Sequence, residues 1–286
     1  MIRRDPTSLH NTIVKIDSAG NASVFASSGL NMPRGVAFDS SGDLFVANYG
    51  NGTIEKFDPS GNGTVFASHL PLPVGSMIPM GLAFDSSGNL YVADYKLGLG
   101  RILKFDPNGN ASVFATGTLL RDPYALTFDV SGNLYVLNDM DNSIVKIDPG
   151  GKQSMFVSTV YPDAHPVDLT FDSSGNLYVA IDNVSTIMKF NSSGTGSVFV
   201  TESIVGGGGD MNGLAIDSSG NLYTSVYGGN RIVKCDPSGN VSLFAGASAG
   251  LDGPGFMAVQ IPEPSSLLLG TGGTLLLWPL LKRKRA

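Results

Sequence analysis

Residues 79–94 read Pro-Met-Gly-Leu-Ala-Phe-Asp-Ser-Ser-Gly-Asn-Leu-Tyr-Val-Ala-Asp: two short apolar segments joined by a turn of Asp, Ser, Gly and Asn. The first segment recurs along the chain, and the second follows each copy. The aromatic or aliphatic residue near the end of the first segment lies at Phe38, Phe84, Phe128, Phe171 and Ile216, with spacings of 46, 44, 43 and 45 residues. A repeat of this period indicates an array of equivalent structural units.

Two further segments complete each unit. One has the form Ile-x-Lys-Phe-Asp and begins at Ile13, Ile54, Ile102, Ile144, Ile187 and Ile232. The other has the form Ser-Val-Phe-Ala and is centred on Phe25, Phe66, Phe114, Phe156, Phe199 and Phe244. All of these segments are rich in β-branched and aromatic residues and bounded by Gly, Asn, Asp or Pro, which is typical of β-strands.

Four antiparallel strands per unit predict the blade of a β-propeller. The Asp-x-Ser-Gly-Asn links fit tight hairpins, because Gly and Asn tolerate positive φ. No stretch of residues 13–260 has a sustained period of 3.6 residues, which excludes a helical solenoid. We therefore expect an all-β fold, a six-bladed β-propeller of four-stranded antiparallel blades over residues 13–260, preceded by a non-repeat segment, residues 1–12.

The full pattern Pro-x-Gly-Leu-Ala-Phe-Asp-x-x-Gly-Asn-Leu-Tyr-Val-Ala-Asp resembles the NHL repeat, and its copies cover nearly all of residues 13–260. This resemblance implies a ring of blades in which the first strand of each blade lines a central channel.

The strand count is uneven at the two ends of the repeat region. The third and fourth segments occur six times and the second only five, while a degraded sixth copy of the first lies at Pro254–Gln260. The ring is therefore predicted to close with a composite blade, whose inner strand comes from the C-terminal end and whose outer strands come from residues 13–27. This blade would lack one strand. Since residues 1–12 offer neither that strand nor the apolar core of a signal peptide, we expect the natural protein to begin upstream.

The composition changes at residue 261. Pro262-Glu263-Pro264 precedes an apolar run from Leu267 to Leu281, and four basic residues follow. The run predicts a short C-terminal transmembrane helix, and the basic residues predict that its end stays cytoplasmic. The alternative is a buried terminal helix, which we favour less because a soluble helix should carry a polar face.

This order of Pro-Glu-Pro, apolar span and basic end resembles the PEP-CTERM sorting signal of Gram-negative bacteria. The resemblance implies export, anchoring in the inner membrane, and processing near residues 262–264 by an exosortase-type enzyme. It also implies a final location at the cell surface or in the extracellular matrix, with exopolysaccharide or a surface protein as partner.

Charge and cysteine content exclude other classes of function. The formal net charge is −6, and Lys and Arg are scattered outside the last few residues, so we expect no nucleic-acid binding. The single cysteine, Cys235, occupies a place that Phe or Ile holds in other units, which indicates a small core residue rather than a nucleophile.

Residues that recur in every unit are predicted to serve the blade itself. These are the lysines of the third segment, Lys15, Lys56, Lys104, Lys146, Lys189 and Lys234, and the turn aspartates Asp39, Asp85, Asp129, Asp172 and Asp217. The aspartates are expected to cap tight turns through their side chains.

Functional residues are expected where the blades differ, at the mouth of the channel. The residue before the Gly position of the inner strand is Arg34, Met80, Tyr124, Val167 or Asn212. From this variation we predict a ligand-binding set of Arg34, Met80, Tyr124, Asp168 and Asn212. We predict no catalytic residue, because no Ser-His-Asp or Cys-His arrangement follows from the spacing.

Acidic residues of the later connecting loops raise the question of a metal. If Asp139, Asp141, Asp163, His165, Asp168, Asp182 and Asp210 share one face, they would form an acidic rim suited to a divalent cation such as calcium, with Asp210 and Asn212 as the predicted ligands. The alternative, which we favour, is a set of solvated turn aspartates.

The sequence therefore predicts an exported binding or scaffold module for a partner protein, a glycan or a small ligand, and we favour a non-enzyme. The alternative is a metal-dependent lactonase or hydrolase of the gluconolactonase-like type, whose members hold a metal with a Glu, two Asn and an Asp. Asn212-Gly213-Leu214 resembles one of their ligand segments, but the equivalent residues of the other blades cannot rebuild that set. A third interpretation is a purely structural spacer.

Overall fold

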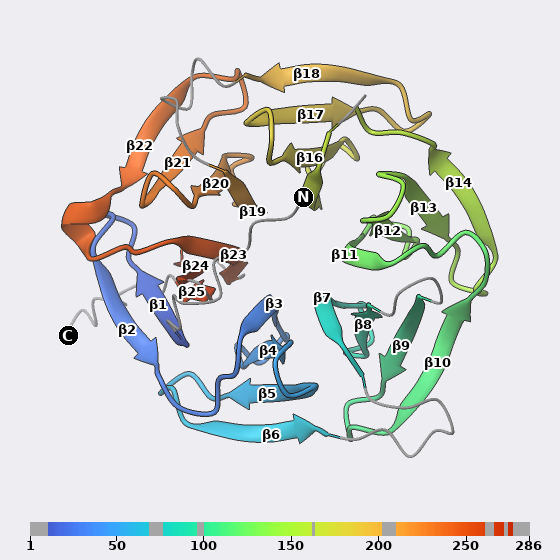
Figure 1. Cartoon of the computed structure of the whole chain (residues 1–286), viewed down its shortest axis with the longest axis horizontal. Coiled ribbons are helices and arrows are strands. Elements are labelled where there is room, and N and C mark those ends of the chain that lie inside the picture. The colour runs from blue at the N-terminus through green and yellow to red at the C-terminus, as the bar shows by residue number, and fades with distance from the viewer. Residues whose placement is uncertain are drawn as a thin grey trace, which may run out of the picture.

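The computed structural model describes residues 11–68, 77–95, 100–161, 164–201 and 210–260, together with the backbone of two strands at 266–271 and 274–276. The strands form five antiparallel four-stranded sheets and one composite sheet, arranged around a central axis (Figure 1). The predicted all-β propeller of four-stranded antiparallel blades is confirmed for these five sheets.

Each regular blade takes its strands in chain order from the centre outwards. The first two blades are β3 (Pro33–Phe38), β4 (Leu44–Asn48), β5 (Thr53–Phe57), β6 (Gly63–Ala67), and β7 (Pro79–Phe84), β8 (Leu90–Asp94), β9 (Arg101–Phe105), β10 (Ala111–Thr116). The third and fourth are β11 (Pro123–Phe128), β12 (Leu134–Asn138), β13 (Ile144–Ile147), β14 (Gln153–Val157), and β15 (Pro166–Phe171), β16 (Leu177–Ile181), β17 (Thr186–Phe190), β18 (Gly196–Val200). The fifth is β19 (Met211–Ile216), β20 (Leu222–Val226), β21 (Arg231–Cys235) and β22 (Val241–Ala245).

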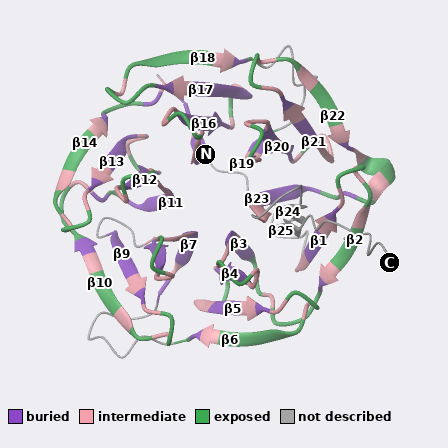
Figure 2. Ribbon diagram, turned by 180° about the vertical axis from the view of Figure 1, so that it is seen from behind, coloured by how far each residue is buried: buried purple, intermediate pink, exposed green. Residues whose placement is uncertain are grey.

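The inner strands close the ring. Each contacts the inner strand of the next blade, and the inner strand of the composite sheet, β23 (Pro254–Gln260), contacts β3. The glycine of the repeat permits this approach: a Cβ on Gly35 would lie 2.2 Å from the Met80 carbonyl oxygen, and one on Gly213 would lie 2.7 Å from the Gly255 oxygen. Backbone thus packs on backbone at the centre, while the outermost strands are the most exposed (Figure 2).

Aromatic side chains of the second strands join each blade to the next. Tyr135 of β12 packs edge-on against Phe156 in its own blade and against Phe171 in the following one, with ring centroids 4.9 and 4.8 Å apart. Tyr91 makes the same pair of contacts one blade earlier. These edge-to-face contacts, together with apolar burial, hold the faces of adjacent blades in contact.

The recurring lysines and turn aspartates are structural, as predicted. In the five regular blades the lysine ammonium lies 5.2–5.6 Å from the centroid of the second-strand ring, in the pairs Lys56–Phe45, Lys104–Tyr91, Lys146–Tyr135, Lys189–Tyr178 and Lys234–Tyr223. The turn aspartates accept backbone N–H groups two and four residues later, as Asp85 does from Ser87 and Asn89. Burial raises the pKa of Asp85, but the hydrogen bonds from Asn89 and Ser87 and the Lys104 charge bring it below its ordinary value.

Cys235 is fully buried in β21, which confirms its prediction as a small core residue. Burial, reinforced by the charge of Asp236, raises the pKa of its thiol to about 12. A thiol that stays protonated at neutral pH is a poor nucleophile.

The composite sheet joins the two ends of the chain, as predicted, but it does not lack a strand. Its order is β2 (Ala22–Ala26), β1 (Thr12–Ile16), β24 (Ser266–Thr271), β23 and β25 (Thr274–Leu276). β24 is antiparallel to both β1 and β23, and Leu268 lies opposite Lys15 on one side and Ala258 on the other. β24 therefore takes the place that the second strand holds in every other blade (Figure 1).

This arrangement corrects the expectation of a transmembrane helix over the apolar run. Part of that run is extended, and the described residues contain no helix long and apolar enough to cross a membrane. The physical reason is that β1 and β23 each present an edge of unpaired N–H and C=O groups, which a short apolar run can pair as a strand. The sorting-signal residues Pro262, Glu263 and Pro264 and the basic end lie outside the described residues.

We expect Leu268→Pro to destabilise the propeller by about 2 kcal/mol or more, because proline removes an N–H from a strand that is paired on both sides. Urea unfolding followed by circular dichroism would measure this loss. Leu268→Val, which keeps the N–H, is the matched control and should stay close to the natural chain. Equal stability of both variants would show that β24 does not pair with β1 and β23 in solution.

Candidate functional site

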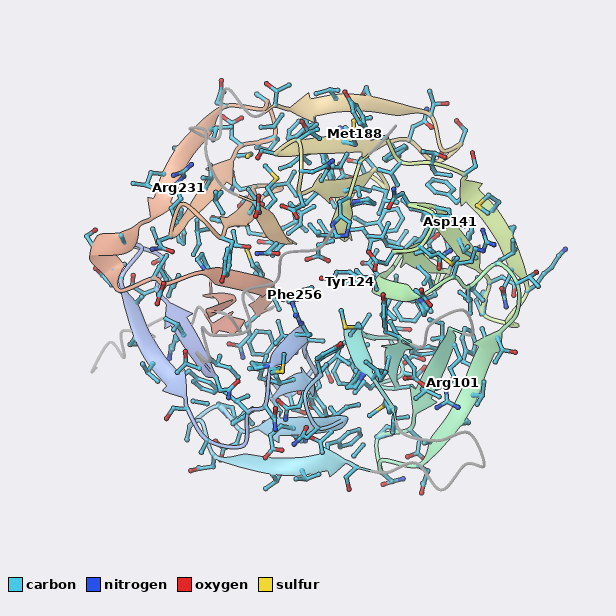
Figure 3. All side chains as sticks on the ribbon, in the orientation of Figure 1. Arg101, Tyr124, Asp141, Met188, Arg231 and Phe256 are labelled. Carbon is cyan, nitrogen blue, oxygen red and sulfur yellow. The ribbon has the colours of Figure 1, made fainter. Side chains whose placement is uncertain are left out.

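One end of the channel is closed by apolar side chains. Tyr124 of β11 and Phe256 of β23 come from opposite sides of the ring and face each other near its centre, with ring centroids 5.9 Å apart (Figure 3). Both residues are buried, and so is Met80 of β7. All three lie near the beginning of their inner strands. This end of the channel carries the loops that enter the inner strands, and we call it the loop face.

The predicted ligand-binding residues are therefore distributed over different environments. Met80 and Tyr124 are buried in the closure rather than exposed at a mouth. Arg34 is half-buried, and its guanidinium lies 5.5 Å from the centroid of the Tyr49 ring. Asn212 is half-buried on β19, and Asp168 lines a cavity deeper in the channel. Ligand binding by these residues stays a prediction.

A ring of five residues surrounds the closure at the loop face. Each of them directly follows a second strand, and its backbone N–H donates to the carbonyl oxygen of the residue directly before the inner strand of the same blade, at 2.8–3.2 Å. All five side chains are half-buried. We call this set the loop-face rim: Tyr49, Tyr95, Asp139, Asp182 and Tyr227.

His165 connects the two acidic members of the rim. Its Nε2 lies 3.1 Å from Asp139 Oδ1, and its Nδ1 lies 3.8 Å from Asp182 Oδ2. The Tyr95 hydroxyl donates to the other Asp139 oxygen at 3.1 Å. The structure thus brings together Asp139, His165 and Asp182, which the sequence had placed only in neighbouring loops.

Asp182 is the member of this cluster whose charge is most perturbed. Burial and the nearby negative charge of Asp210 raise the pKa of Asp182 to about 6, although His165 acts in the opposite direction. Its Oδ1 is buried and has no hydrogen-bond partner. Asp182 is therefore an acceptor that protein groups satisfy only in part.

The remaining predicted metal ligands do not join this cluster as a set. Asp210 is exposed, and Asp141 accepts from Ser143 and lies 3.4 Å from Arg121. Asp163 lies outside the described residues. Within the described part of the chain, no three His, Cys, Asp or Glu side chains are grouped so that they could hold a metal ion. Metal binding by Asp210 and Asn212 stays a prediction.

The last residue of the second strand ties the preceding loop to its blade. Asn48 accepts the Asn31 N–H and donates to the Gly29 carbonyl and to the Thr53 hydroxyl. Asn138 makes the same set of bonds in its blade. These side chains are fully buried and support the loop face rather than form its surface.

One blade replaces this neutral pattern with an ion pair. Asp94 accepts the Ile78 N–H at 2.7 Å, and its other oxygen accepts from the Arg101 Nε. A carboxylate cannot donate a hydrogen bond as the Asn48 amide does to Thr53. The residue equivalent to Thr53 in this blade is Arg101, which donates to the carboxylate instead. Both partners are buried, and Arg101 is labelled in Figure 3.

A cavity of about 340 Å³ occupies the other half of the channel. Its lining comes from the later residues of the inner strands, including Phe128, Phe171 and Ile216, each of which directly precedes a turn. It therefore lies toward the end with the Asp-x-x-Gly turns, which we call the turn face. Pockets of this size and shape are typical of sites for small ligands.

Asp168 is the one ionisable side chain among the described residues that line the cavity. Its Oδ1 accepts the Leu169 N–H at 2.9 Å, and its Oδ2 accepts the Leu214 N–H of the next inner strand at 2.8 Å. Burial raises the pKa of Asp168 to about 7, although both hydrogen bonds favour the charged form. Asp168 occupies the position that Gly35, Gly81 and Gly213 hold in other blades, so it bridges two strands that glycine elsewhere lets pack directly.

The tyrosines of the rim were not identified from the sequence. The variable positions singled out in the repeat lie on the inner strands and in the later loops, whereas each tyrosine of the rim directly follows a second strand. The signal was present in the repeat, because that position reads Tyr, Tyr, Asp, Asp and Tyr in successive blades. Only the structure shows that these side chains surround the channel while their predecessors are buried.

Comparison with known proteins supports the fold. Residues 30–57 match the NHL repeat. The structure is similar to a streptogramin B lyase (TM-score 0.66, 17% identity, 91% of this chain and 86% of that chain) and to a calcium-binding regucalcin of Agrobacterium tumefaciens (TM-score 0.69, 19% identity, 89% and 86%). It is also similar to a chain of a nidogen/laminin complex (TM-score 0.65, 19% identity, 83% and 95%).

Among curated proteins no sequence matches this chain. One segment of the chain matches the NHL repeat, and the structural similarities show a β-propeller fold. At identities below 20% these similarities concern the fold alone.

Stability should depend on the ionisation of Asp168. Its pKa is about 7 in the folded chain against an ordinary value of 3.8, so the folded chain binds this proton more tightly than the unfolded chain does. The resulting stabilisation is present at low pH and is lost as the pH rises through about 7. Between about pH 5 and pH 8 we expect the free energy of unfolding to fall by on the order of 2 kcal/mol.

Urea unfolding at both pH values, with Asp168→Asn beside the natural chain, would measure this dependence. The variant should keep only the smaller slope that Asp182 causes, since the pKa of Asp182 is also raised, to about 6. The same slope in both proteins would contradict the assignment of the effect to Asp168.

Proposed function

We propose that this protein is an exported, surface- or matrix-associated binding module, and that its loop-face rim contacts a partner that carries positive charges. The observation that carries the proposal is the rim itself, in which three tyrosines and two carboxylates surround a closed channel. A closed channel leaves this end as a contact surface rather than an entrance. Tyrosine supplies a large apolar area with a polar tip, which is why it is enriched at binding surfaces.

The charge of the rim favours a cationic partner. Asp139 and Asp182 are its two acidic members, and the other three are tyrosines. An ammonium or guanidinium group can donate to these carboxylates and pack against a tyrosine face. The net charge of −6 would favour the approach of such a partner over long range.

Export and anchoring form part of the same proposal. Support comes from the order of residues 262–264, the apolar run and the basic end, which resembles a PEP-CTERM signal. On this proposal the chain is held at the inner membrane of a Gram-negative bacterium, processed by an exosortase-type enzyme and then located at the cell surface or in the matrix. The apolar run also provides β24, so membrane anchoring requires this strand to leave the composite sheet.

Two kinds of partner fit the rim, a surface protein with exposed lysines and a glycan with free amino groups. The metal-dependent lactonase or hydrolase of the gluconolactonase-like type stays an alternative prediction. No feature of the described residues favours it over binding.

The proposal is tested by surface plasmon resonance of the immobilised chain against a lysine-rich peptide, an amine-bearing chitosan oligomer and its fully acetylated counterpart. We expect the first, the second or both to bind, and the acetylated oligomer to bind at least tenfold more weakly. Asp139→Asn with Asp182→Asn should weaken binding of the cationic probe about tenfold or more, the effect of removing close charge pairs at an interface. Binding should also weaken as the pH falls from 7.5 to 5, because Asp182 takes up a proton near pH 6.

Asp43→Asn is the control, a single removal of charge at the opposite face. Asp43 lies in a turn-face hairpin at a position where four other blades have Asn, so the variant removes one negative charge and keeps a turn sequence that the repeat already uses. Its affinity should stay within about twofold of the natural chain. Equal binding by the rim double variant and the natural chain, or binding of the acetylated oligomer alone, would overturn the proposal.

A further inference from the structure

The cavity at the turn face is separate from the loop-face rim, and the proposed function does not use it. We propose that it is a binding site for a small organic cation, a protonated amine with a compact apolar body, held by an ion pair with Asp168. The cavity, its lining and the position of this carboxylate in the repeat support the inference independently of the rim.

The first argument is the chemical asymmetry of the lining. A partly open pocket of about 340 Å³ is lined mainly by Gly, Ala, Leu, Ile, Met, Val and Phe residues, and Asp168 supplies the one carboxylate of this lining. No Lys, Arg or His is among the described residues of the lining. A carboxylate taken out of water without a cation nearby is unfavourable, and a bound cation would compensate it.

The second argument is that the fold does not need a carboxylate at this position. Three other inner strands have glycine there, in Gly35, Gly81 and Gly213, and β11 has Ala125. In those strands the close approach of neighbouring backbones is sufficient. Asp168 interrupts that pattern in one blade and places a charge at the cavity wall.

The third argument is that Asp168 is held in a fixed orientation. The N–H groups of Leu169 and Leu214 each donate to one of its oxygens, at 2.9 and 2.8 Å. Each oxygen keeps a further lone pair for a donor in the cavity. An immobilised carboxylate pays little conformational entropy when a ligand binds.

The lining also restricts the class of ligand. A divalent cation prefers six or more oxygen ligands, and a single carboxylate is a poor site for it. An anion would be repelled. A protonated amine needs one anionic partner, its hydrocarbon part suits the apolar walls, and the hydroxyls of Thr127 and Thr170 are among the polar groups of the lining. The cavity lies at the small end of the range for ligand sites, so the ligand is no larger than a small metabolite.

The test uses matched pairs of probes on the full chain. Cyclohexylamine and n-butylamine, both protonated at neutral pH, are compared with cyclohexanol and 1-butanol by ligand-observed NMR and by thermal shift at pH 8. We expect each amine to bind at least tenfold more tightly than its alcohol and to raise the melting temperature. Amine affinity should fall on the order of tenfold at pH 5.5, where Asp168 is protonated and the amine remains charged.

Two substitutions locate the effect. Asp168→Asn removes the charge and keeps the size of the side chain. Asp168→Gly introduces the residue that three other inner strands have at this position, so it should fold even where Asn does not. In both, the preference for amine over alcohol should fall to within about twofold, while Asp43→Asn and the rim double variant keep it. The inference is overturned if alcohols bind as tightly as amines, if either folded Asp168 variant keeps the preference, or if no amine binds at concentrations up to about 10 mM.

Amine binding by the rim double variant distinguishes the two proposals. If this variant no longer binds amines, the amines bind at the loop face and the inference about the cavity is overturned. Loss of the cationic-polymer interaction in that variant, with amine binding unchanged, would support both.

Discussion

The close approach of the six inner strands is the constraint on which the rest of the molecule depends. At Gly35 and Gly213 a neighbouring backbone lies within 3 Å of where a side chain would begin, so the ring closes only where the repeat supplies glycine or an equivalent arrangement. Edge-to-face aromatic contacts then hold adjacent blades together, as Tyr135 does with Phe171, and each recurring lysine stacks on a ring of its own blade. A backbone-on-backbone centre leaves few positions at which the chain can vary without opening the ring.

The positions that do vary lie at the two ends of the channel, and they differ in kind. At the loop face Tyr124 and Phe256 close the channel, and the variable residues after the second strands form a rim of tyrosines and carboxylates. At the turn face a cavity remains, and one carboxylate replaces the glycine of the repeat. The same scaffold thus offers a broad polar contact surface and a small pocket with a single carboxylate, and the two sites suit different ligands.

The composite sheet is completed by a strand from the C-terminal segment. β1 and β23 come from opposite ends of the chain and leave a strand-wide gap between two unpaired edges. An apolar run with no helical partner fills it as β24, because pairing both edges satisfies backbone groups that would otherwise lack partners. Sequence patterning identified the gap from the missing copy of one segment. It assigned the run to a helix, because a short apolar segment has no internal signal that separates a strand from a span.

The sequence by itself determined the blades, the turn aspartates, the structural role of the recurring lysines and the core position of Cys235, because each follows from a local pattern repeated at a fixed period. It did not determine which variable side chains meet. Tyr95, Asp139 and His165 lie in different blades or loops, and Met80 and Tyr124 are buried by Phe256 from the far side of the ring. Such contacts join residues far apart in the chain, and only the closure of the ring sets their distances.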